Sequence, residues 1–316
     1  MLNRKVKMNH FITLKDIPAT DLRKILTDAK KRKDKRKKFS TLEVDKDTPL
    51  KGKLLVQMFE KSSLRTRLSF YLAIKQLGGG TITLRANELH LGKGGESLAD
   101  TARILSTYGD GFMLRTDSDK KIEEFSKYLT IPVINGLSPS SHPTQVLSDI
   151  FTVEEIKKRP ISRLNICWIG DSNNVLNSLI AASVKFSFRL SVGCPKNYEP
   201  KKFVLDWVKK NNGKINIYND AKKAAKNSDV IFSDKVISLN DKVNKNKKIR
   251  DFKNFQINSK LMSFAKKNVT FLHCLPRGTE VSSEVFLGKN SKVWLQALNR
   301  VHVQKSILLY CFGKLR

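Results

Sequence analysis

The sequence predicts an α/β protein made of two domains, each built on a parallel β-sheet. The chain has 316 residues, which suits two domains of about 150 residues better than one hydrophobic core. Short apolar, strand-like runs alternate with helix-like segments, as βαβ units require. The alternation starts afresh after Pro160, and polar side chains follow many of the strand-like runs. These three observations carry the prediction.

The first series of elements fills the N-terminal half. A helix is expected within 14–33, capped by Thr20 or Asp21. Strand-like runs lie at 52–60, 80–84, 110–116 and 131–137. Helical patterns lie at 63–77, 97–109, 122–129 and 142–158, and a glycine-rich loop at 86–97. The last of these helices carries Pro143 in its first turn, a favoured place for proline.

The second series follows the same pattern. Strand-like runs lie at 164–171, 189–195, 214–220, 229–234 and 269–275. Helical patterns lie at 173–187, 201–211, 221–228 and 258–268. A final apolar, helical stretch at 297–312 is too long to be a linker. Strands that alternate with helices in this way favour parallel sheets over antiparallel ones.

The chain is strongly basic. It has 60 Lys and Arg residues against 29 Asp and Glu residues, a formal net charge of +31. Lysines occur along the whole chain, with denser runs at 30–38 and 241–253. No aromatic residue interrupts the first run, and we expect Phe252 and Phe255 near the second to pack in a core. We therefore favour a solvated lysine-rich surface, whose field steers an anionic substrate, over a nucleic-acid interface, which remains an alternative.

The cysteines and the chain's start indicate a cytoplasmic protein. Cys167, Cys194, Cys274 and Cys311 are far apart, so we expect free thiols rather than disulfides or a zinc site. No apolar run reaches the roughly 18 residues of a membrane span. The basic start lacks the apolar stretch of a secretory signal, and Met8 is a candidate for the true initiator. We expect no metal, no cofactor and no membrane partner.

Polar residues gather where the predicted strands end. In parallel α/β sheets, ligands bind outside the carboxyl ends of the strands. The residues at these ends are Ser63, Arg65, Thr66, Arg115, His142, Gln145, Asp171, Asn173, Asn174, Asp234, His273 and Cys274. The stretch "GDSNNV" after the first strand of the second series lacks GxGxxG, which argues against a dinucleotide. No Ser/His/Asp arrangement indicates a nucleophilic triad.

The segment "SLRTR" has the properties of an anion site. A helix N-terminus presents unpaired N–H groups and a partial positive charge. Ser63 is expected at the N-cap, and Arg65 in the first turn offers a fork to phosphate oxygens. Arg67 lies about 200° around the helix from Arg65, so we expect it to pair with a structural carboxylate instead. His142 and Gln145 are three residues apart and share a face of the next candidate helix.

Five motifs then combine into one resemblance. "FEKSSLRTR", "HPTQ", "GDSNNV", "HCLP" and "NRVHVQK" occur in this order over the whole chain, and the ordered set closely resembles the aspartate/ornithine carbamoyltransferase family, on its ornithine-using side. The resemblance implies a carbamoyl-phosphate domain at 8–148, completed by a C-terminal helix at 300–316 that packs back on it. It implies an amino-acid domain at 149–299. It also implies a homotrimer with active sites at subunit interfaces.

The resemblance also implies roles for individual residues. Residues that would bind carbamoyl phosphate are Ser63, Leu64, Arg65, Thr66, Arg115, His142, Gln145, Cys274, Leu275 and Arg300, with His90 reaching into a neighbouring subunit. Residues that would hold ornithine are Asn174, Asp234, Ser238 and Leu239. The catalytic set would be Arg115, His142, Asp234, Cys274 and Arg300. The implied reaction transfers a carbamoyl group to L-ornithine, giving citrulline and phosphate for arginine biosynthesis.

The chain departs from the family's usual pattern mainly on the amino-acid side. Leu64 replaces a threonine, and Leu239 and Asn240 stand for a methionine and a glycine. "HCLPRGTEV" is two residues shorter than usual, and acids are common where Gln296 and Leu298 stand. Alternative acceptors are therefore acetylated or succinylated ornithine and putrescine. Aspartate fits less well, because that branch typically has proline where Cys274 stands. A further alternative is a homologue that binds carbamoyl phosphate but does not catalyse the transfer.

Overall fold

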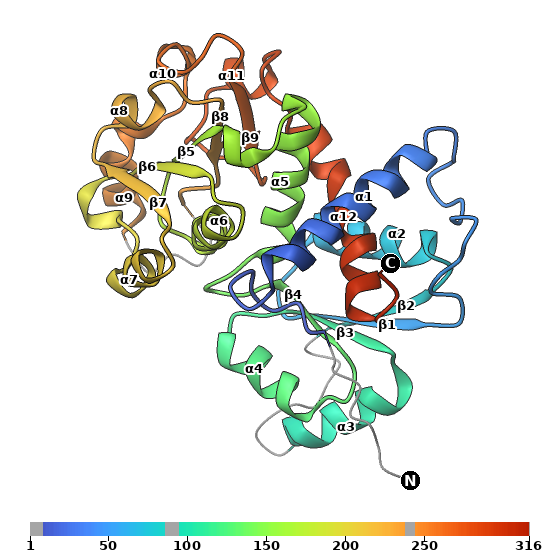
Figure 1. The fold of residues 1–316 in the computed structure, drawn as a ribbon. Helices are drawn as coiled ribbons and strands as arrows, with labels where there is room; N and C mark the ends of the chain where they lie inside the picture. The colour runs from blue at the N-terminus through green and yellow to red at the C-terminus, as the bar shows by residue number, and fades with distance from the viewer. Residues whose placement is uncertain (1–8, 86–94, 238–243, 316) are drawn as a thin grey trace. The chain divides into compact units, whose positions relative to one another are not determined.

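The computed structural model describes residues 9–85, 95–237 and 244–315. The chain forms two compact units, one of Met1–Leu147 with Arg300–Arg316 and the other of Ser148–Asn299 (Figure 1). The chain passes between the units within two helices, α5 (Pro143–Lys157) and α12 (Val293–Cys311). The C-terminal half of α12 belongs to the first unit, so the predicted return of the last helix is confirmed.

The first unit contains a four-stranded parallel sheet in the order β2-β1-β3-β4. Its strands are β1 (Leu54–Phe59), β2 (Gly80–Arg85), β3 (Gly111–Arg115) and β4 (Val133–Leu137). Its own helices are α1 (Ala19–Lys35), α2 (Leu64–Gln76), α3 (Leu98–Tyr108) and α4 (Asp119–Tyr128). Helices α3 and α4 cover one face of this sheet, and α1, α2 and α12 lie on the other (Figure 1).

Alternating residues of the strands build the core on the face covered by α3 and α4. Val56 and Met58 of β1 point to this face and join a buried cluster that contains Ala102 of α3 and Phe125 of α4. The rings of Phe112 and Phe125 lie 4.9 Å apart. Because both faces of the central strands are covered, β1 and β3 are buried along most of their length, whereas the edge strand β2 is partly exposed.

The second unit contains a five-stranded parallel sheet in the order β7-β6-β5-β8-β9. Its strands are β5 (Asn165–Ile169), β6 (Arg189–Gly193), β7 (Lys214–Tyr218), β8 (Val230–Ser233) and β9 (Thr270–His273). Its helices are α6 (Asn174–Lys185), α7 (Lys202–Lys210), α8 (Ala221–Ala225), α9 (Lys245–Asp251), α10 (Ser259–Met262) and α11 (Ser283–Leu287). Phe252 and Phe255 lie in its core, as expected. Two parallel-sheet α/β units confirm the predicted fold class.

Several helices differ from prediction. Helix α1 begins at Ala19 behind Pro18, which provides no side-chain cap, so the predicted caps Thr20 and Asp21 are wrong. The predicted helix at 258–268 shrinks to α10, because hydrogen bonds to the loop before β8 replace its later helical bonds: Asn227 N–H donates to Phe264 O and Lys266 N–H to Ser228 O. Helices α9 and α11 were not predicted, since seven and five residues are too few for a periodic signal.

None of the helices in the described ranges is long and apolar enough to cross a membrane.

A buried ionic network fixes α12 in the first unit. The Lys305 side chain is fully buried, and its Nζ donates to Asp45 Oδ1 at 2.7 Å and to Gln76 Oε1 at 3.3 Å. Burial, opposed by the hydrogen bond to Asp45, lowers the pKa of Lys305 to about 8. One residue further on, the Ser306 hydroxyl donates to Asp28 of α1 at 2.6 Å. A buried amine is tolerated only when it is paired in this way.

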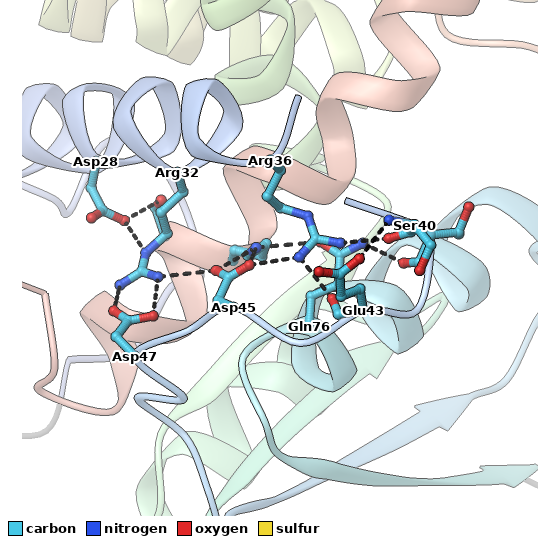
Figure 2. Close-up of polar contacts among 11 residues, drawn as sticks. Asp28, Arg32, Arg36, Ser40, Glu43, Asp45, Asp47 and Gln76 are labelled. Carbon is cyan, nitrogen blue, oxygen red and sulfur yellow. Dashed lines mark hydrogen bonds and ion pairs between the residues drawn. The ribbon is translucent and has the colours of Figure 1, made fainter. Parts of the chain in front are cut away.

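Asp45 is the centre of this network (Figure 2). Besides Lys305, it accepts from Arg36 Nη1 at 2.7 Å and from Arg32 Nη1 at 3.1 Å. Arg32 also binds Asp47 through Nη2 at 2.9 Å and Asp28 through Nε at 3.1 Å. One carboxylate thus joins α1, α12 and the loop between α1 and β1.

Asp45→Asn should destabilise the first unit strongly. The change leaves three cations around a neutral amide, and removing one partner of a buried ion pair costs about 3–5 kcal/mol. The measurement is the free energy of unfolding in urea. The matched control is Asp34→Asn, because Asp34 pairs with Lys37 at 3.7 Å on the exposed surface, where we expect less than about 1 kcal/mol. Equal effects of the two substitutions would contradict the central role of Asp45.

Candidate functional site

The first cluster of candidate residues forms where α2 begins behind β1. Ser63 has an extended backbone and its hydroxyl accepts from Thr66 N–H at 3.4 Å, so the predicted N-cap is confirmed. Its chain neighbour Leu64 is exposed, and Arg65 is half-buried. No acidic residue lies in the first turn of α2. The helix N-terminus therefore keeps its partial positive charge for an anion.

Arg67 behaves differently from the prediction. Its side chain is exposed, and within the described ranges of the chain the structure pairs it with no carboxylate. The predicted structural ion pair is therefore not found there. The helical geometry that separates Arg67 from Arg65 still holds, because α2 is regular from Leu64 onward.

Thr66 is the point on which three distant segments converge. Its side chain is almost fully buried, and its hydroxyl accepts from Arg300 Nη2 at 2.8 Å. Arg115, at the end of β3, approaches the same hydroxyl with Nη1 at 3.5 Å. Arg300 also donates to Gln145 Oε1 on the first turn of α5. Two guanidinium groups and an amide thus meet at the start of α2.

His142 completes this cluster as a neutral imidazole. It precedes Pro143, which opens α5 as predicted, and it is 5% exposed. Burial lowers the pKa of His142 well below its usual value, and the charges of Arg300, Arg115 and Arg65 act in the same direction. The ring is therefore uncharged at neutral pH, so that one of its nitrogens can donate a hydrogen bond and the other can accept one. The three arginines create a positive potential that suits a phosphate.

Glu60 links the two strand ends that carry this cluster. It follows β1, its backbone N–H donates to Arg115 O at 2.9 Å, and its carboxylate accepts from the Thr116 hydroxyl and from Lys121. This holds the end of β3 beside the loop that leads into α2. The sequence analysis did not single out Glu60, although it stands within the quoted motif "FEKSSLRTR".

The second cluster lies in the other unit, between the ends of β5 and β8. Gly170 adopts a φ of +150°, which an L side chain rarely allows, and the chain then turns into α6. Asn173 caps α6 by accepting from Val175 N–H at 3.0 Å and Leu176 N–H at 3.1 Å. Its amide donates to Asp234 Oδ2 at 2.9 Å. Asn173 thereby orients Asp234, a role that the sequence analysis missed.

Asp234 and Asn174 are the described members of the predicted amino-acid set. Asn174 is the first residue of α6, and Asp234 follows β8 directly. Burial raises the pKa of Asp234, with Glu280 acting in the same direction and the hydrogen bond from Asn173 opposing it. Ser238 and Leu239 lie outside the described residues, and so does His90.

A buried ion pair supports the turn between β5 and α6. Lys248 on α9 is 3% exposed, and its Nζ lies 2.6 Å from Asp171 Oδ2. Lys248 also lies above the ring of Tyr198, 5.9 Å from its centre. The sequence analysis placed Lys248 in a solvated basic run. A lysine in such a run gives no signal of burial, so only the tertiary structure reveals its partner.

The end of β9 is held by a histidine–carboxylate pair. Leu275 N–H donates to His273 Nδ1 at 2.9 Å, so this nitrogen carries no proton. The proton is therefore on Nε2, which donates to Glu280 Oε1 at 3.1 Å. Glu280 also accepts from Val236 N–H at 3.4 Å. Glu280 was missed as a site residue, although it stands four residues after "HCLP".

Cys274 and Leu275 lie between these anchors. Cys274 is 8% exposed and forms no disulfide. Leu275 has a left-handed backbone with φ of +60°, which costs a non-glycine residue about 1–3 kcal/mol and persists only where the surroundings enforce it. Gln296 of α12 adds a further support, because its Oε1 accepts from His273 N–H at 2.9 Å and its Nε2 donates to Asp149 at 2.8 Å.

The described residues hold no group of three or more His, Cys, Asp and Glu side chains placed to bind a metal ion.

Family models and known proteins agree on one relationship. Residues 9–155 match the carbamoyl-P binding domain of aspartate/ornithine carbamoyltransferases, and residues 162–311 match their Asp/Orn binding domain. The chain is 40% identical to an ornithine carbamoyltransferase of Agrobacterium fabrum over 306 residues, covering 96% of this chain and 98% of the relative. It is 42% identical to one of Brucella suis, with 96% of each covered.

Solved structures give the same result. The structure of ornithine carbamoyltransferase from Pyrococcus furiosus matches with a TM-score of 0.89 and 38% identity, covering 96% of this chain and 97% of that one. The anabolic ornithine carbamoyltransferase from Campylobacter jejuni matches with a TM-score of 0.87 and 36% identity, covering 97% and 100%. The motifs, the two parallel sheets and these matches together show that the chain belongs to the aspartate/ornithine carbamoyltransferase family.

Proposed function

We propose that this protein is an ornithine carbamoyltransferase, which transfers the carbamoyl group of carbamoyl phosphate to the side-chain amine of L-ornithine. The products are citrulline and phosphate, and the reaction serves arginine biosynthesis. The observation that carries the proposal is the convergence of Arg300, Arg115 and Gln145 around Thr66 at the start of α2. The family and the names of its relatives supply the identity of the two substrates.

Carbamoyl phosphate is bound in the unit that residues 8–148 and 300–316 form. The phosphate lies at the N-terminus of α2, with the Ser63 and Thr66 hydroxyls, the backbone N–H of Leu64 and the guanidinium of Arg65. Only a backbone contact is needed at position 64, so a leucine is compatible with this role. The exposed Leu64 side chain agrees with it, because the side chain points to solvent.

Charge stabilisation is the main catalytic contribution on this side. When the amine attacks, negative charge develops on the carbamoyl oxygen and then on the leaving phosphate. Arg115, Arg300 and His142 surround that charge, with Gln145 orienting Arg300. Because His142 is neutral, its single N–H can donate a hydrogen bond to the carbamoyl oxygen without transferring the proton. Preorganised donors of this kind supply several kcal/mol to catalysis.

The amino-acid unit, residues 149–299, binds ornithine and presents its amine. Asn174, Asp234, Ser238 and Leu239 hold the amino acid, and Cys274 and Leu275 border the reacting amine and the carbamoyl group. The amine must be uncharged to form the new C–N bond. As the bond from the carbamoyl carbon to the phosphate oxygen breaks, the phosphate takes the proton that the amine loses. Most of the rate gain then comes from positioning and electrostatics.

The functional assembly that we propose is a cytoplasmic homotrimer, with His90 reaching into a neighbour's site. Helix α2 supports an interface, because Leu64, Leu68 and Tyr71 form an exposed apolar stripe at positions i, i+4 and i+7. The four cysteines form no disulfide, which agrees with a reducing compartment.

Product formation from carbamoyl phosphate and a panel of amines tests the reaction. We expect citrulline from L-ornithine, and no comparable product from N-acetylornithine, N-succinylornithine, putrescine or L-aspartate. Preference for another amine would contradict the assignment of ornithine but not the assignment of the carbamoyl phosphate site. A protein inactive with all five amines, yet able to bind carbamoyl phosphate, would contradict carbamoyl transfer to them.

Arg65→Ala should weaken carbamoyl phosphate binding by about 10- to 100-fold, because a charge-assisted hydrogen bond contributes about 1.5–3 kcal/mol. The dissociation constant is measured by titration calorimetry. Arg67→Ala is the matched control. It removes the same positive charge two residues further along the helix, from a side chain that is exposed. Unchanged affinity in Arg65→Ala, or an equal loss in both variants, would show that the anion site at α2 is wrongly placed.

Cys274→Ala should lower kcat by about tenfold or more while changing the dissociation constant of carbamoyl phosphate much less, because Cys274 acts mainly on the amine. Steady-state kinetics and calorimetry separate the two quantities. Cys167→Ala serves as the control for loss of a buried thiol in the same unit, and its kcat should be unaffected. Parallel loss of turnover and donor affinity in Cys274→Ala would refute the role.

A further inference from the structure

A pocket lined by charged residues lies in the first unit, apart from the residues assigned to catalysis. Its volume is about 420 Å³, within the range of small-molecule sites. It is formed by α1 and the loop that follows, and its lining residues are Asp28, Lys31, Arg32, Lys35, Arg36, Phe39, Asp45, Lys46 and Asp47. None of these residues has a part in the proposed reaction. Asp45, Arg32 and Arg36, which line the pocket, also belong to the ionic network drawn in Figure 2.

The carboxylates of this pocket are fully engaged with its deepest cations. Asp45 is shared by Arg32, Arg36 and Lys305, and Asp47 binds Arg32. Asp28 accepts from Arg32 as well. Three carboxylates therefore balance the two arginines and the buried lysine beneath the pocket.

Three further lysines lie at the pocket, and one of them, Lys35, adds to the effect of Arg32 in lowering the pKa of Asp47. Lys31, Lys35 and Lys46 are exposed, and none of them forms an ion pair with a carboxylate in the part of the chain that the structure describes. The pocket and the buried Lys305 together thus carry an excess of about three positive charges at neutral pH. Such an excess in a concave site raises the local concentration of anions.

The buried lysine agrees with this excess of positive charge. Burial is the main reason for the low pKa of Lys305, and the charges of Arg36 and Arg32 lower the pKa further. The attraction of Asp45 does not offset these effects. A negative charge above the network would relieve the repulsion.

The chemistry of the free donors indicates which anion fits. The guanidinium forks of Arg32 and Arg36 are already occupied by carboxylates and by the backbone carbonyls of Glu43 and Ser40. The remaining donors are ammonium groups, which bind phosphate oxygens as point charges. Phe39 adds an apolar wall, stacked against Arg36 at 5.1 Å. The pocket therefore offers ammonium groups for charge and one aromatic surface for an organic part.

We propose that this pocket binds an organic phosphate with two or three negative charges, held by Lys31, Lys35 and Lys46 and packed against Phe39. Its occupant stabilises the network that fixes α12, the helix that carries Arg300. The inference is independent of the reaction proposed above, because it concerns a separate set of residues.

Titration calorimetry with inorganic pyrophosphate tests the proposal on the full chain. The titration is done without carbamoyl phosphate, which as a doubly charged organic phosphate would compete for the pocket, and it is repeated on Arg65→Ala to identify binding at the donor site. We expect one pyrophosphate per chain and a rise in the unfolding temperature of the protein. The double variant Lys35→Gln, Lys46→Gln should lower the affinity by about tenfold, because each charge near the surface contributes about 0.7 kcal/mol.

The matched control is Lys30→Gln, Lys38→Gln, which removes the same net charge from the same region outside the pocket. It should bind pyrophosphate like the wild type. Equal loss in both double variants would show diffuse attraction to a basic surface and overturn the proposal. Absence of pyrophosphate binding in Arg65→Ala would also overturn it, because any binding to the wild type would then belong to the donor site. Equal affinity for citrate would refute the assignment to phosphate chemistry.

Discussion

The ion pair between Lys305 and Asp45 is the interaction on which the first unit depends. It fixes α12, a helix from the end of the chain, to the loop that follows α1. Arg300 lies five residues before Lys305 on the same helix, about 7.5 Å along its axis. The guanidinium of Arg300 reaches Thr66 and Gln145 because the helix is held at this place. The phosphate-side cluster is therefore assembled from residues 63–66, 115, 142–145 and 300, and the last of them arrives only through α12.

Positive charge is used in two different ways in this unit. Around Thr66 three arginines gather at a helix start whose first turn contains no acid, and their charges add to burial in keeping the His142 imidazole neutral. Around Asp45 most of it is cancelled by acids, which makes the network structural. The difference follows from geometry. Carboxylates can reach Arg32 and Arg36 from α1 and its following loop, whereas the first turn of α2 contains none.

The second unit shows how a departure from the family pattern can be accommodated. Gln296 stands where an acid is common, and it bridges the backbone of His273 and the carboxylate of Asp149. An acid at this position would face Asp149 with a like charge, whereas the amide donates to it. Leu298, the second such departure, is exposed, and nothing in the structure explains it. The His273–Glu280 pair then fixes Cys274 and Leu275 from the other side.

The sequence by itself determined the two parallel sheets, the strand ends that carry polar residues, and the cap at Ser63. These features are local, since they depend on periodicity and on residues within a few positions of one another. Local signals failed for α9 and α11, which are too short for a period, and for the start of α1, where Pro18 precedes the predicted caps.

Only the tertiary structure decided which side chains meet. Arg300 and Thr66 are 234 residues apart in the chain, Lys305 and Asp45 are 260 apart, and Lys248 and Asp171 are 77 apart. In the sequence, a lysine that pairs with a buried aspartate cannot be distinguished from a lysine on a basic surface. The charge of such a residue follows from its residue type, but its burial and its partner depend on packing between distant segments.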